Sequence, residues 1–144
     1  MKKLFVLFLL TLSLTVHAQV TKMLGQWNTF DDKTGEMASC VQITEKNGVY
    51  SCVIVNLYEK DGKGSYRIMN PPYPKQFENF VGTQLFIDMK EHKGHLKGKV
   101  YDPESGNTYH GKVTYEPKTD ELVLRGSLDK AGLLGRSQTW KRKK

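Results

Sequence analysis

The sequence predicts an all-β protein, folded as an antiparallel up-and-down β-barrel of about eight strands. Turn residues recur at intervals of roughly 8–12 residues along the chain, which is typical of β-sandwiches and barrels. Between the turns, short segments alternate apolar and polar residues, as strands with one buried face do. No segment shows the apolar repeat of an amphipathic helix, which is about 3.6 residues, so we expect little helix.

Eight strands are expected between these turns. They are Leu24–Phe30, Met37–Thr44, Val49–Tyr58, Gly82–Lys90, His95–Tyr101, Thr108–Glu116, Glu121–Leu128 and Leu134–Lys141, with a short extra strand over Ser65–Met69 as an open alternative. The turns Asp31–Gly35 and Asp102–Gly106 share the pattern Asp-x-x-(Ser/Thr)-Gly. In this pattern the aspartate caps the turn and the glycine accepts the left-handed conformation that ends it. The Pro-rich residues 70–74 predict a longer loop between two halves of the sheet.

Residues 1–18 are expected to be a cleaved secretory signal peptide. Lys2 and Lys3 precede an apolar run over Leu4–Val16, and Ala18 ends a small-residue cleavage site. The run is shorter than the roughly 20 residues of a membrane span, although a retained anchor is the rival interpretation. Residues 19–144 then form one barrel domain, exported to the periplasm or secreted, and not an integral membrane protein.

The charge of the chain is mildly basic. The formal net charge is +7, and removing residues 1–18 with their two lysines leaves 20 basic residues against 15 acidic ones, or +5. This excess is compatible with an acidic partner such as an anionic lipid, but it does not require one. The lysines are scattered along the sequence, so no nucleic-acid partner is predicted. The oligomeric state cannot be predicted.

The chain has two cysteines, Cys40 and Cys52, and export would permit a disulfide between them. Alternation that turns Val41 and Val53 inward would put both cysteines on the outer face of one hairpin. The turn around Asn47–Gly48 decides whether they lie directly opposite or diagonally. Only the direct arrangement gives the Cα spacing of a disulfide, so a bridge and two free thiols are both open.

Hairpin loops set the register of the second half of the sheet. Four-residue loops are expected at Glu91–Gly94, Pro103–Gly106 and Pro117–Asp120, and a five-residue loop at Asp129–Leu133. They put Ile87 opposite Gly98, Gly98 opposite Gly111, Gly111 opposite Gly126, and Gly126 opposite Arg136. This row of inward glycines either lets the sheet curl into a barrel or leaves a cavity beside Arg136 for an acidic head group.

The last strand carries polar residues on its inward face. If Leu134 faces inward, Arg136, Gln138 and Trp140 do too, and buried polar groups need partners. Either the guanidinium stacks on an indole such as Trp27 in a structural network, or it contacts a ligand. The residues proposed to line the barrel lumen and bind a ligand are Trp27, Tyr109, Val113, Tyr115, Leu124, Arg136, Gln138 and Trp140.

Several motifs in a fixed order resemble a known family. They are Gly25-Gln26-Trp27, the turn Asp31–Gly35, the segment Tyr101–Tyr109, Leu124-Arg125-Gly126 and the segment Leu134–Trp140. Together they resemble the secreted bacterial family Domain of Unknown Function 2147, and the Gly-x-Trp with a late arginine resembles the lipocalins. The resemblance implies a lipocalin-like β-barrel exported from a bacterium, with no established activity. Many members look to have a cysteine pair in the loop after the third strand, whereas Glu59–Phe80 has none here.

No catalytic residue, metal site or cofactor is predicted. His92 and His95 are expected to be exposed in a hairpin loop, and no third metal ligand is evident. Asp31, Asp32 and Asp102 are explained by turn capping. The expected function is therefore non-catalytic binding of a small hydrophobic or amphipathic ligand, such as a lipid or fatty acid, which is an extrapolation from fold. The alternatives are a solid-packed structural or protein-interaction module of the cell envelope and, third, an envelope-acting hydrolase.

Overall fold

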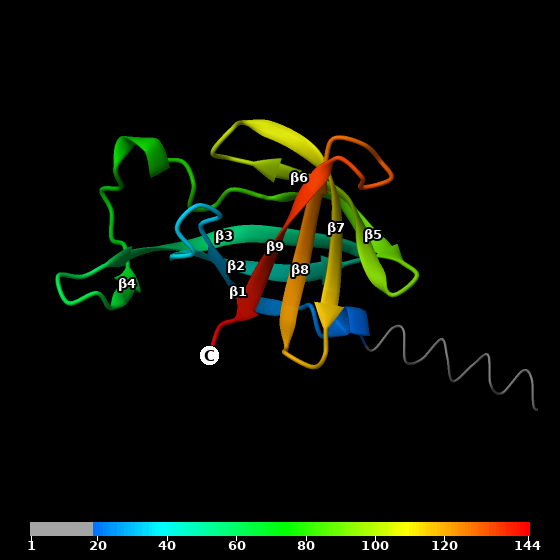
Figure 1. Ribbon diagram of the computed structural model, residues 1–144, viewed down its shortest axis with the longest axis horizontal. Coiled ribbons are helices and arrows are strands. Elements are labelled where there is room, and N and C mark those ends of the chain that lie inside the picture. The colour runs from blue at the N-terminus through cyan, green and yellow to red at the C-terminus, as the bar shows by residue number, and fades with distance from the viewer. Residues whose placement is uncertain (1–18) are drawn as a thin grey trace, which may run out of the picture.

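The computed structural model describes residues 19–144 and confirms the all-β prediction (Figure 1). Within these residues, eight strands form one closed antiparallel barrel. They are β1 (Gly25–Phe30), β2 (Met37–Lys46), β3 (Val49–Lys60), β5 (Phe86–His92), β6 (His95–Asp102), β7 (Asn107–Glu116), β8 (Glu121–Ser127) and β9 (Gly135–Arg142). Their order around the sheet is β2-β1-β9-β8-β7-β6-β5-β3, and the β2–β3 pairing closes the ring. The predicted signal peptide over residues 1–18 lies outside the described residues.

The long connection between β3 and β5 leaves the barrel. The far end of β3 pairs with the short strand β4 (Tyr66–Ile68), which confirms the extra strand, and a 3₁₀ turn η1 (Lys75–Phe77) follows. Figure 1 shows this excursion standing to one side of the barrel. The next strand starts at Phe86, later than the predicted Gly82, because Gly82 adopts φ +89° and the backbone there is irregular. Before β5, an isolated bridge joins Gln84 to Val53, and single backbone hydrogen bonds join Gly82, Thr83 and Leu85 to β3.

Two-residue turns connect the tightest hairpins. Asn47 and Gly48, with φ of 53° and 79°, join β2 to β3, and Lys93 and Gly94, with φ of 51° and 85°, join β5 to β6. Two successive positive φ angles match the twist of adjacent strands, which explains the Asn-Gly and Lys-Gly pairs. The predicted four-residue loop over 91–94 is therefore wrong. The loops at 103–106 and 117–120 have the predicted length.

The register of the glycine row is confirmed from β6 to β9. Gly98 pairs with Gly111, Gly111 with Gly126, and Gly126 with Arg136. The pairing of Ile87 with Gly98 is wrong, because Ile87 pairs with Lys99 and the ladder is interrupted before Lys90. The shorter β5–β6 turn shifts the pairing of the two strands. The interruption between Ile87 and Lys90 is a β-bulge, and the residues of β5 that follow it lie on the faces expected for them.

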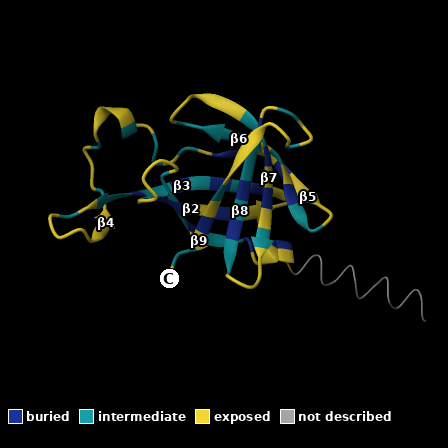
Figure 2. Cartoon of the chain, viewed as in Figure 1, coloured by how far each residue is buried: buried dark blue, intermediate teal, exposed yellow. Residues whose placement is uncertain are grey.

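Apolar side chains fill the barrel. The fully buried side chains are Val20, Met23, Trp27, Cys40, Val41, Ile43, Cys52, Met89, Leu96, Val113 and Leu122. Figure 2 shows the buried residues along the strands of the barrel, where exposed residues also occur, and loops that are largely exposed. Residues 19–21 are helical, and Val20 and Met23 reach the core from the segment before β1. Leu85 and Met89 face the core, whereas Ile87, expected to face inward opposite Gly98, is 38% exposed on the outside.

Both cysteines are free thiols, and the register keeps them apart. Cys52 pairs with Ile43, and Cys40 pairs with Asn56. The prediction that both lie on the outer face is wrong for Cys52, which belongs to the core. The inward side of β3 carries Tyr50, Cys52 and Ile54, not the valines. Cys40 contacts Gln26, with Sγ 3.9 Å from Oε1, and is buried although it lies outside the main core cluster.

Candidate functional site

An arginine closes the lower end of the barrel, where the first and last strands meet. Trp27 pairs with Arg142 across β1 and β9, and the guanidinium carbon lies 4.2 Å from the centroid of the indole. Trp27 donates a hydrogen bond from Nε1 to the Met23 carbonyl at 2.8 Å. Arg142 donates to the Lys22 carbonyl (2.6 Å) and the Leu24 carbonyl (3.3 Å). The guanidinium therefore fastens the segment before β1 to the indole of the core.

An ion pair completes this end. Arg142 Nε lies 2.8 Å from Asp120 Oδ2, and the Tyr115 hydroxyl donates to Asp120 Oδ1 at 2.9 Å. The hydrogen bond from Arg142 holds the pKa of Asp120 below its usual range, and Asp120 raises the pKa of Arg142 in return. The hydrogen bond to Asp120 also raises the pKa of Tyr115. A surface cavity of about 390 Å³ lies beside this cluster.

The guanidinium stacked on Trp27 is thus Arg142. The sequence predicted that the guanidinium of Arg136 stacks on an indole in a structural network. Such a network exists, but Arg142, six residues later, forms it. The β9 strand extends to Arg142, one residue beyond the sequence-based end, and the same two-residue alternation that turns Trp140 inward reaches Arg142. Gly25 lies beside this guanidinium, and its φ of +112° is a conformation that residues with a side chain rarely adopt. Alternation continued through 142 would have identified this residue.

Arg136 lies at the opposite end of the barrel, which we call the open end because its polar side chains are more exposed to solvent. Its side chain is 73% exposed, and its Nη1 lies 3.3 Å from Asp32 Oδ2. Gln138 donates from Nε2 to the same carboxylate oxygen at 3.0 Å. Asp32 belongs to the β1–β2 turn, where Asp31 accepts hydrogen bonds from the backbone N–H groups of Lys33 (2.9 Å) and Thr34 (2.8 Å). The turn motif and the last-strand motif therefore meet at this end.

The polar contacts continue down to an aromatic pair. Trp140 donates from Nε1 to Gln138 Oε1 at 3.2 Å, and its ring stacks on Phe86 with centroids 6.4 Å apart and planes at 10°. Trp140 and Phe86 are each 2% exposed. A chain of contacts thus runs from a buried indole through Gln138 to Asp32 and the exposed Arg136. We call Asp32, Arg136 and Gln138 the polar rim.

The eight candidate lining residues fall into three groups. Trp27, Val113, Leu124 and Trp140 are buried in the core. Tyr115 is half-buried beside Asp120 at the closed end. Tyr109, Arg136 and Gln138 are half-buried or exposed toward the open end. The structure therefore does not bring all eight around one space, and Asp32 and Phe86 join the open-end group unpredicted.

The glycine row serves two purposes. A Cβ on Gly98 would lie 2.7 Å from the Asp88 carbonyl oxygen, and one on Gly111 would lie 2.4 Å from Val100 Cγ2. These two glycines are required by close approach of the strands, as in the bending interpretation. A Cβ on Gly126 would meet only Tyr109 Cβ, at 3.8 Å. Space beside Arg136 is therefore left by Gly126 alone.

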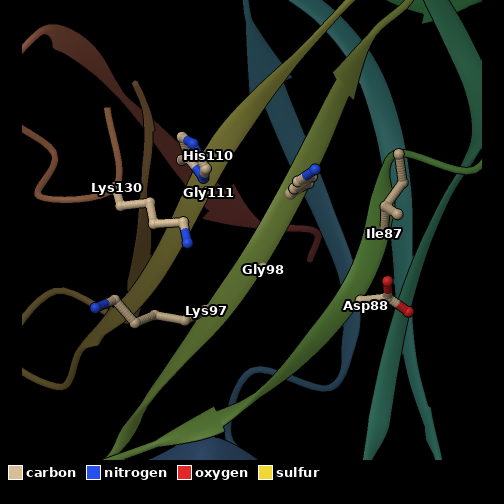
Figure 3. Close-up of a pocket in the computed structure, with 8 residues that line it drawn as sticks. Ile87, Asp88, Lys97, Gly98, His110, Gly111 and Lys130 are labelled. Carbon is tan, nitrogen blue, oxygen red and sulfur yellow. The ribbon is translucent and has the colours of Figure 1, made fainter. Parts of the chain in front are cut away.

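A second surface cavity, of about 330 Å³, lies on the outer face of the sheet. It is lined by Ile87, Asp88, Lys97, Gly98, Lys99, His110, Gly111 and Lys130 (Figure 3). Lys97 and Lys99 come from β6, His110 from β7, and Lys130 from the β8–β9 loop. This basic cluster could not be predicted from the sequence, because its lysines are scattered along the chain and only the strand register brings them together.

The histidines of the described residues are not grouped with other metal ligands. Within residues 19–144, no three side chains of His, Cys, Asp or Glu are grouped as metal ligands would be. The rings of His92 and His95 lie 5.7 Å apart. His92 is exposed as predicted, whereas His95 is half-buried and its Nε2 lacks a hydrogen-bond partner among the described residues. Burial lowers the pKa of His95. In the same range, no helix has the length and apolarity needed to cross a membrane.

Comparison with known proteins matches the fold and the motifs. Residues 25–142 match the family described as "uncharacterized protein conserved in bacteria (DUF2147)". The structure is similar to the Helicobacter pylori protein HP1028, described as belonging to the lipocalin family, with a TM-score of 0.61 and 23% identity over 84% of this chain and 82% of that chain. None of the curated proteins matches the sequence. The chain forms a closed eight-stranded barrel with an arginine stacked on the Gly-x-Trp indole, and the family match extends over its strands. The chain therefore belongs to the bacterial DUF2147 family and has a lipocalin-like fold.

Proposed function

We propose that this protein is a non-catalytic binding barrel that holds a small hydrophobic or amphipathic molecule, such as a fatty acid, at its open end. The observation that carries the proposal is the polar rim, Asp32, Arg136 and Gln138, directly linked to the buried Trp140–Phe86 pair. An amphipathic ligand needs a polar group for its head and an apolar surface for its chain, and these two lie in contact here. Barrels of eight strands are about wide enough for one such molecule.

The proposed ligand position is the open half of the barrel. The closed half is occupied, because Trp27, Val113 and Leu122 are fully buried there. Toward the open end, Gly126 carries no side chain and Tyr109 is only half-buried. The ligand chain would displace Tyr109 or Gln138 to reach the aromatic pair. Of the candidate lining set, we therefore propose Tyr109, Arg136, Gln138 and Trp140 as ligand contacts, and Trp27, Val113, Tyr115 and Leu124 as supporting structure.

The proposed ligand is anionic at its head. Arg136 is largely exposed and is held by one carboxylate, Asp32, at 3.3 Å. A ligand carboxylate could replace Asp32 as the partner of this guanidinium, since arginine pairs well with planar carboxylates. If a ligand carboxylate replaces Asp32 beside Arg136, the guanidinium keeps a negatively charged partner throughout.

Displacement of a fluorescent fatty acid tests the proposal. Arg136→Leu should weaken binding at least about tenfold, because a hydrogen bond to a charged group is lost. Arg67→Leu, which removes another exposed, ion-paired arginine outside the barrel, is the matched control and should bind like the parent protein. The methyl ester of the fatty acid should bind the parent and Arg136→Leu equally. Equal fatty-acid affinity in the parent and Arg136→Leu would remove the proposed head-group site.

A solid-packed module without a small ligand is the second candidate function, and the filled core favours it. The side chains that fill the lower barrel are fully buried; they are Trp27, Met89, Leu96 and Leu122. The two surface cavities described above are lined by residues of the barrel end and the outer face, not by these side chains. Failure of the parent protein to bind any fatty acid would support this candidate.

We also propose that the protein acts outside the cytoplasm after removal of residues 1–18. The N-terminal lysines, the apolar run and the small residues at 16–18 support export. Expression of the full chain in a bacterium should yield a periplasmic or secreted product that begins at Gln19, which N-terminal sequencing checks. A non-catalytic role is supported by the positions of Asp31, Asp61 and Asp129, whose pKa values are lowered by backbone hydrogen bonds in three separate turns.

A further inference from the structure

The loop between β8 and β9, residues 128–134, displays apolar side chains to solvent. Leu128, Leu133 and Leu134 are 72%, 80% and 66% exposed. The other exposed large apolar residues among the described residues are between 38% and 44% exposed. We call residues 128–134 the leucine loop; it is the orange loop at the upper edge of the molecule in Figure 1. Clustered exposed leucines on one loop are unusual for a surface with no partner.

The leucine loop is held in a fixed shape. Asp129 accepts hydrogen bonds from the backbone N–H groups of Leu133 (3.0 Å) and Leu134 (2.7 Å). Arg125 on β8 donates to the carbonyls of Gly132 (2.6 Å) and Leu133 (3.4 Å). The two hydrogen bonds to backbone N–H groups also lower the pKa of Asp129. The exposure of the leucines is therefore built into the loop rather than a result of fraying.

A row of cations crosses the outer face of the sheet next to this loop. Lys90 pairs with Lys97, Lys97 with Lys112, and Lys112 with Arg125. We call these four residues the cationic band. Like charges directly opposite on neighbouring strands reduce stability. The salt bridges among the described residues involve other cations, namely Lys60, Arg67, Arg136 and Arg142.

The outer cavity joins the band to the loop. Lys97, Lys99 and His110 line it from the sheet, and Lys130 reaches it from the leucine loop (Figure 3). Asp88 is the one carboxylate among its lining residues. The cavity is about 330 Å³, and Lys97 belongs to both the cavity and the band. Through Lys130 and the contacts of Arg125 with the loop carbonyls, the leucine loop adjoins the cationic band.

We propose that this surface docks the protein onto an anionic phospholipid bilayer, with the leucine loop entering the interface and the cationic band facing the lipid phosphates. Interfacial binding depends on apolar insertion together with attraction to anionic lipids, and this surface supplies both. A nucleic acid would use the cations but would leave the leucines in water. The surface lies outside the barrel, so the proposal goes beyond ligand binding at the polar rim and does not depend on it.

Cosedimentation with vesicles tests the proposal. Residues 19–144, which contain every strand of the closed barrel, are mixed with vesicles of phosphatidylglycerol and phosphatidylethanolamine, or of phosphatidylcholine alone. The protein should bind the anionic vesicles, and added salt should weaken the binding because surface charges are screened. Lys97→Gln/Lys112→Gln should lower the partition coefficient about 25-fold, at about fivefold for each lysine. Leu133→Ser/Leu134→Ser should lower it about tenfold or more, since apolar burial is lost.

Matched controls separate docking from general charge and from folding. Lys46→Gln/Lys118→Gln removes two exposed lysines elsewhere and should cause a much smaller loss of binding, as should Ile68→Ser on β4. Thermal unfolding should show the cationic-band variant to be at least as stable as the parent, because two opposed charges are removed. The proposal is overturned by equal binding to neutral vesicles, by full binding of the leucine variant, or by tighter binding to a DNA duplex than to anionic vesicles.

Discussion

Arg142 joins the first and last strands at one end of the barrel through several contacts at once. One guanidinium contacts the Trp27 ring, two backbone carbonyls of the segment just before it, and Asp120, so the N-terminal segment and the β7–β8 turn meet on it. Because Trp27 is fully buried, the guanidinium covers the end of the core while its other side remains in contact with water.

Replacement of Arg142 should therefore destabilise the fold. Arg142→Ala should lower the free energy of unfolding by roughly 2–3 kcal/mol, through the lost cation–π contact and charged hydrogen bonds. Trp27→Ala should cost roughly 3–5 kcal/mol, because it also empties the core. Urea unfolding measures both, and Arg67→Ala is the control, with an expected change of at most about 1 kcal/mol. An unchanged midpoint for Arg142→Ala would contradict the closure role.

Both thiols should be inert in the folded protein. Burial raises the pKa of Cys52, and Coulomb repulsion from Cys40 adds to the shift; burial is also the main cause of the raised pKa of Cys40. A buried thiol with a raised pKa is a poor nucleophile. Mass spectrometry after iodoacetamide treatment should show no added group on the native protein and two after denaturation. A mass two protons lower, resistant to alkylation after denaturation, would instead reveal a disulfide.

His95 should make stability depend on pH. Burial lowers its pKa from the ordinary 6.5, so the unfolded chain binds the proton more tightly than the folded protein does. Stability should therefore fall as the pH falls below about 6.5, and remain flat above it. Urea midpoints at about pH 8 and about pH 5 measure the difference, which should shrink in His95→Asn. An equal pH dependence in His95→Asn would assign the effect to another group.

At the scale of elements, the bulge in β5 explains why Gly98 is glycine. The irregular pairing between Ile87 and Lys90 brings three backbone atoms of β5 within 2.8 Å of where a Cβ on Gly98 would stand. Asp88 in this bulge adopts φ 49°, which is uncommon for a residue with a side chain. The bulge bends the outer face at the site of the basic cavity.

Two alanine substitutions distinguish the roles of the glycines. Gly98→Ala should destabilise the protein by roughly 1–3 kcal/mol, because the methyl group collides with backbone that cannot move freely. Gly126→Ala should change stability by less than about 1 kcal/mol, because the added methyl group makes ordinary contact with Tyr109 and restricts the unfolded chain. Thermal unfolding of the pair measures this contrast. Equal losses in both variants would mean that the bulge does not require Gly98.

At the scale of elements, strand register could be predicted from the sequence where turn residues defined the length of a loop. The turns at 103–106 and 117–120 have Asp, Pro and Gly signals, and the pairings from Gly98 to Arg136 are those predicted. The face of β3 was predicted wrongly because Val49–Leu57 is an almost continuous apolar run, in which alternation cannot choose between Tyr50–Cys52–Ile54 and the valines. The bulge in β5 could not be predicted either, because a shorter turn and a bulge compensate each other.

For the whole molecule, the sequence predicted the barrel and the family but not the arrangement of its site. The motifs around Asp32 and Arg136 meet at the open end, a contact across more than a hundred residues that only closure of the barrel creates. Asp32 was interpreted as a turn cap, whereas the adjacent Asp31 has that role. The basic surface could not be predicted for the same reason, because lysines from three strands and a loop, with Arg125 from a fourth strand, are gathered by strand pairing alone.

The scale of the whole molecule also separates its two proposed contacts. The polar rim lies at the open end of the barrel, and the cationic band lies on the outer face of β5–β8. A protein bound to a bilayer through the outer face would keep a separate binding site at its rim. Substitutions in one contact should therefore leave the other unchanged, since distant sites usually behave independently.

Native mass spectrometry tests the central claim, ligand binding at the polar rim, most directly. Residues 19–144 and the Arg136→Leu variant would be purified without detergent and exposed to a lipid extract of a bacterial cell envelope. The account predicts one bound adduct of defined mass on the parent protein and a strongly reduced adduct on Arg136→Leu, with both proteins folded. A bare mass for the parent under every condition would contradict the binding barrel and leave the solid-packed module as its function.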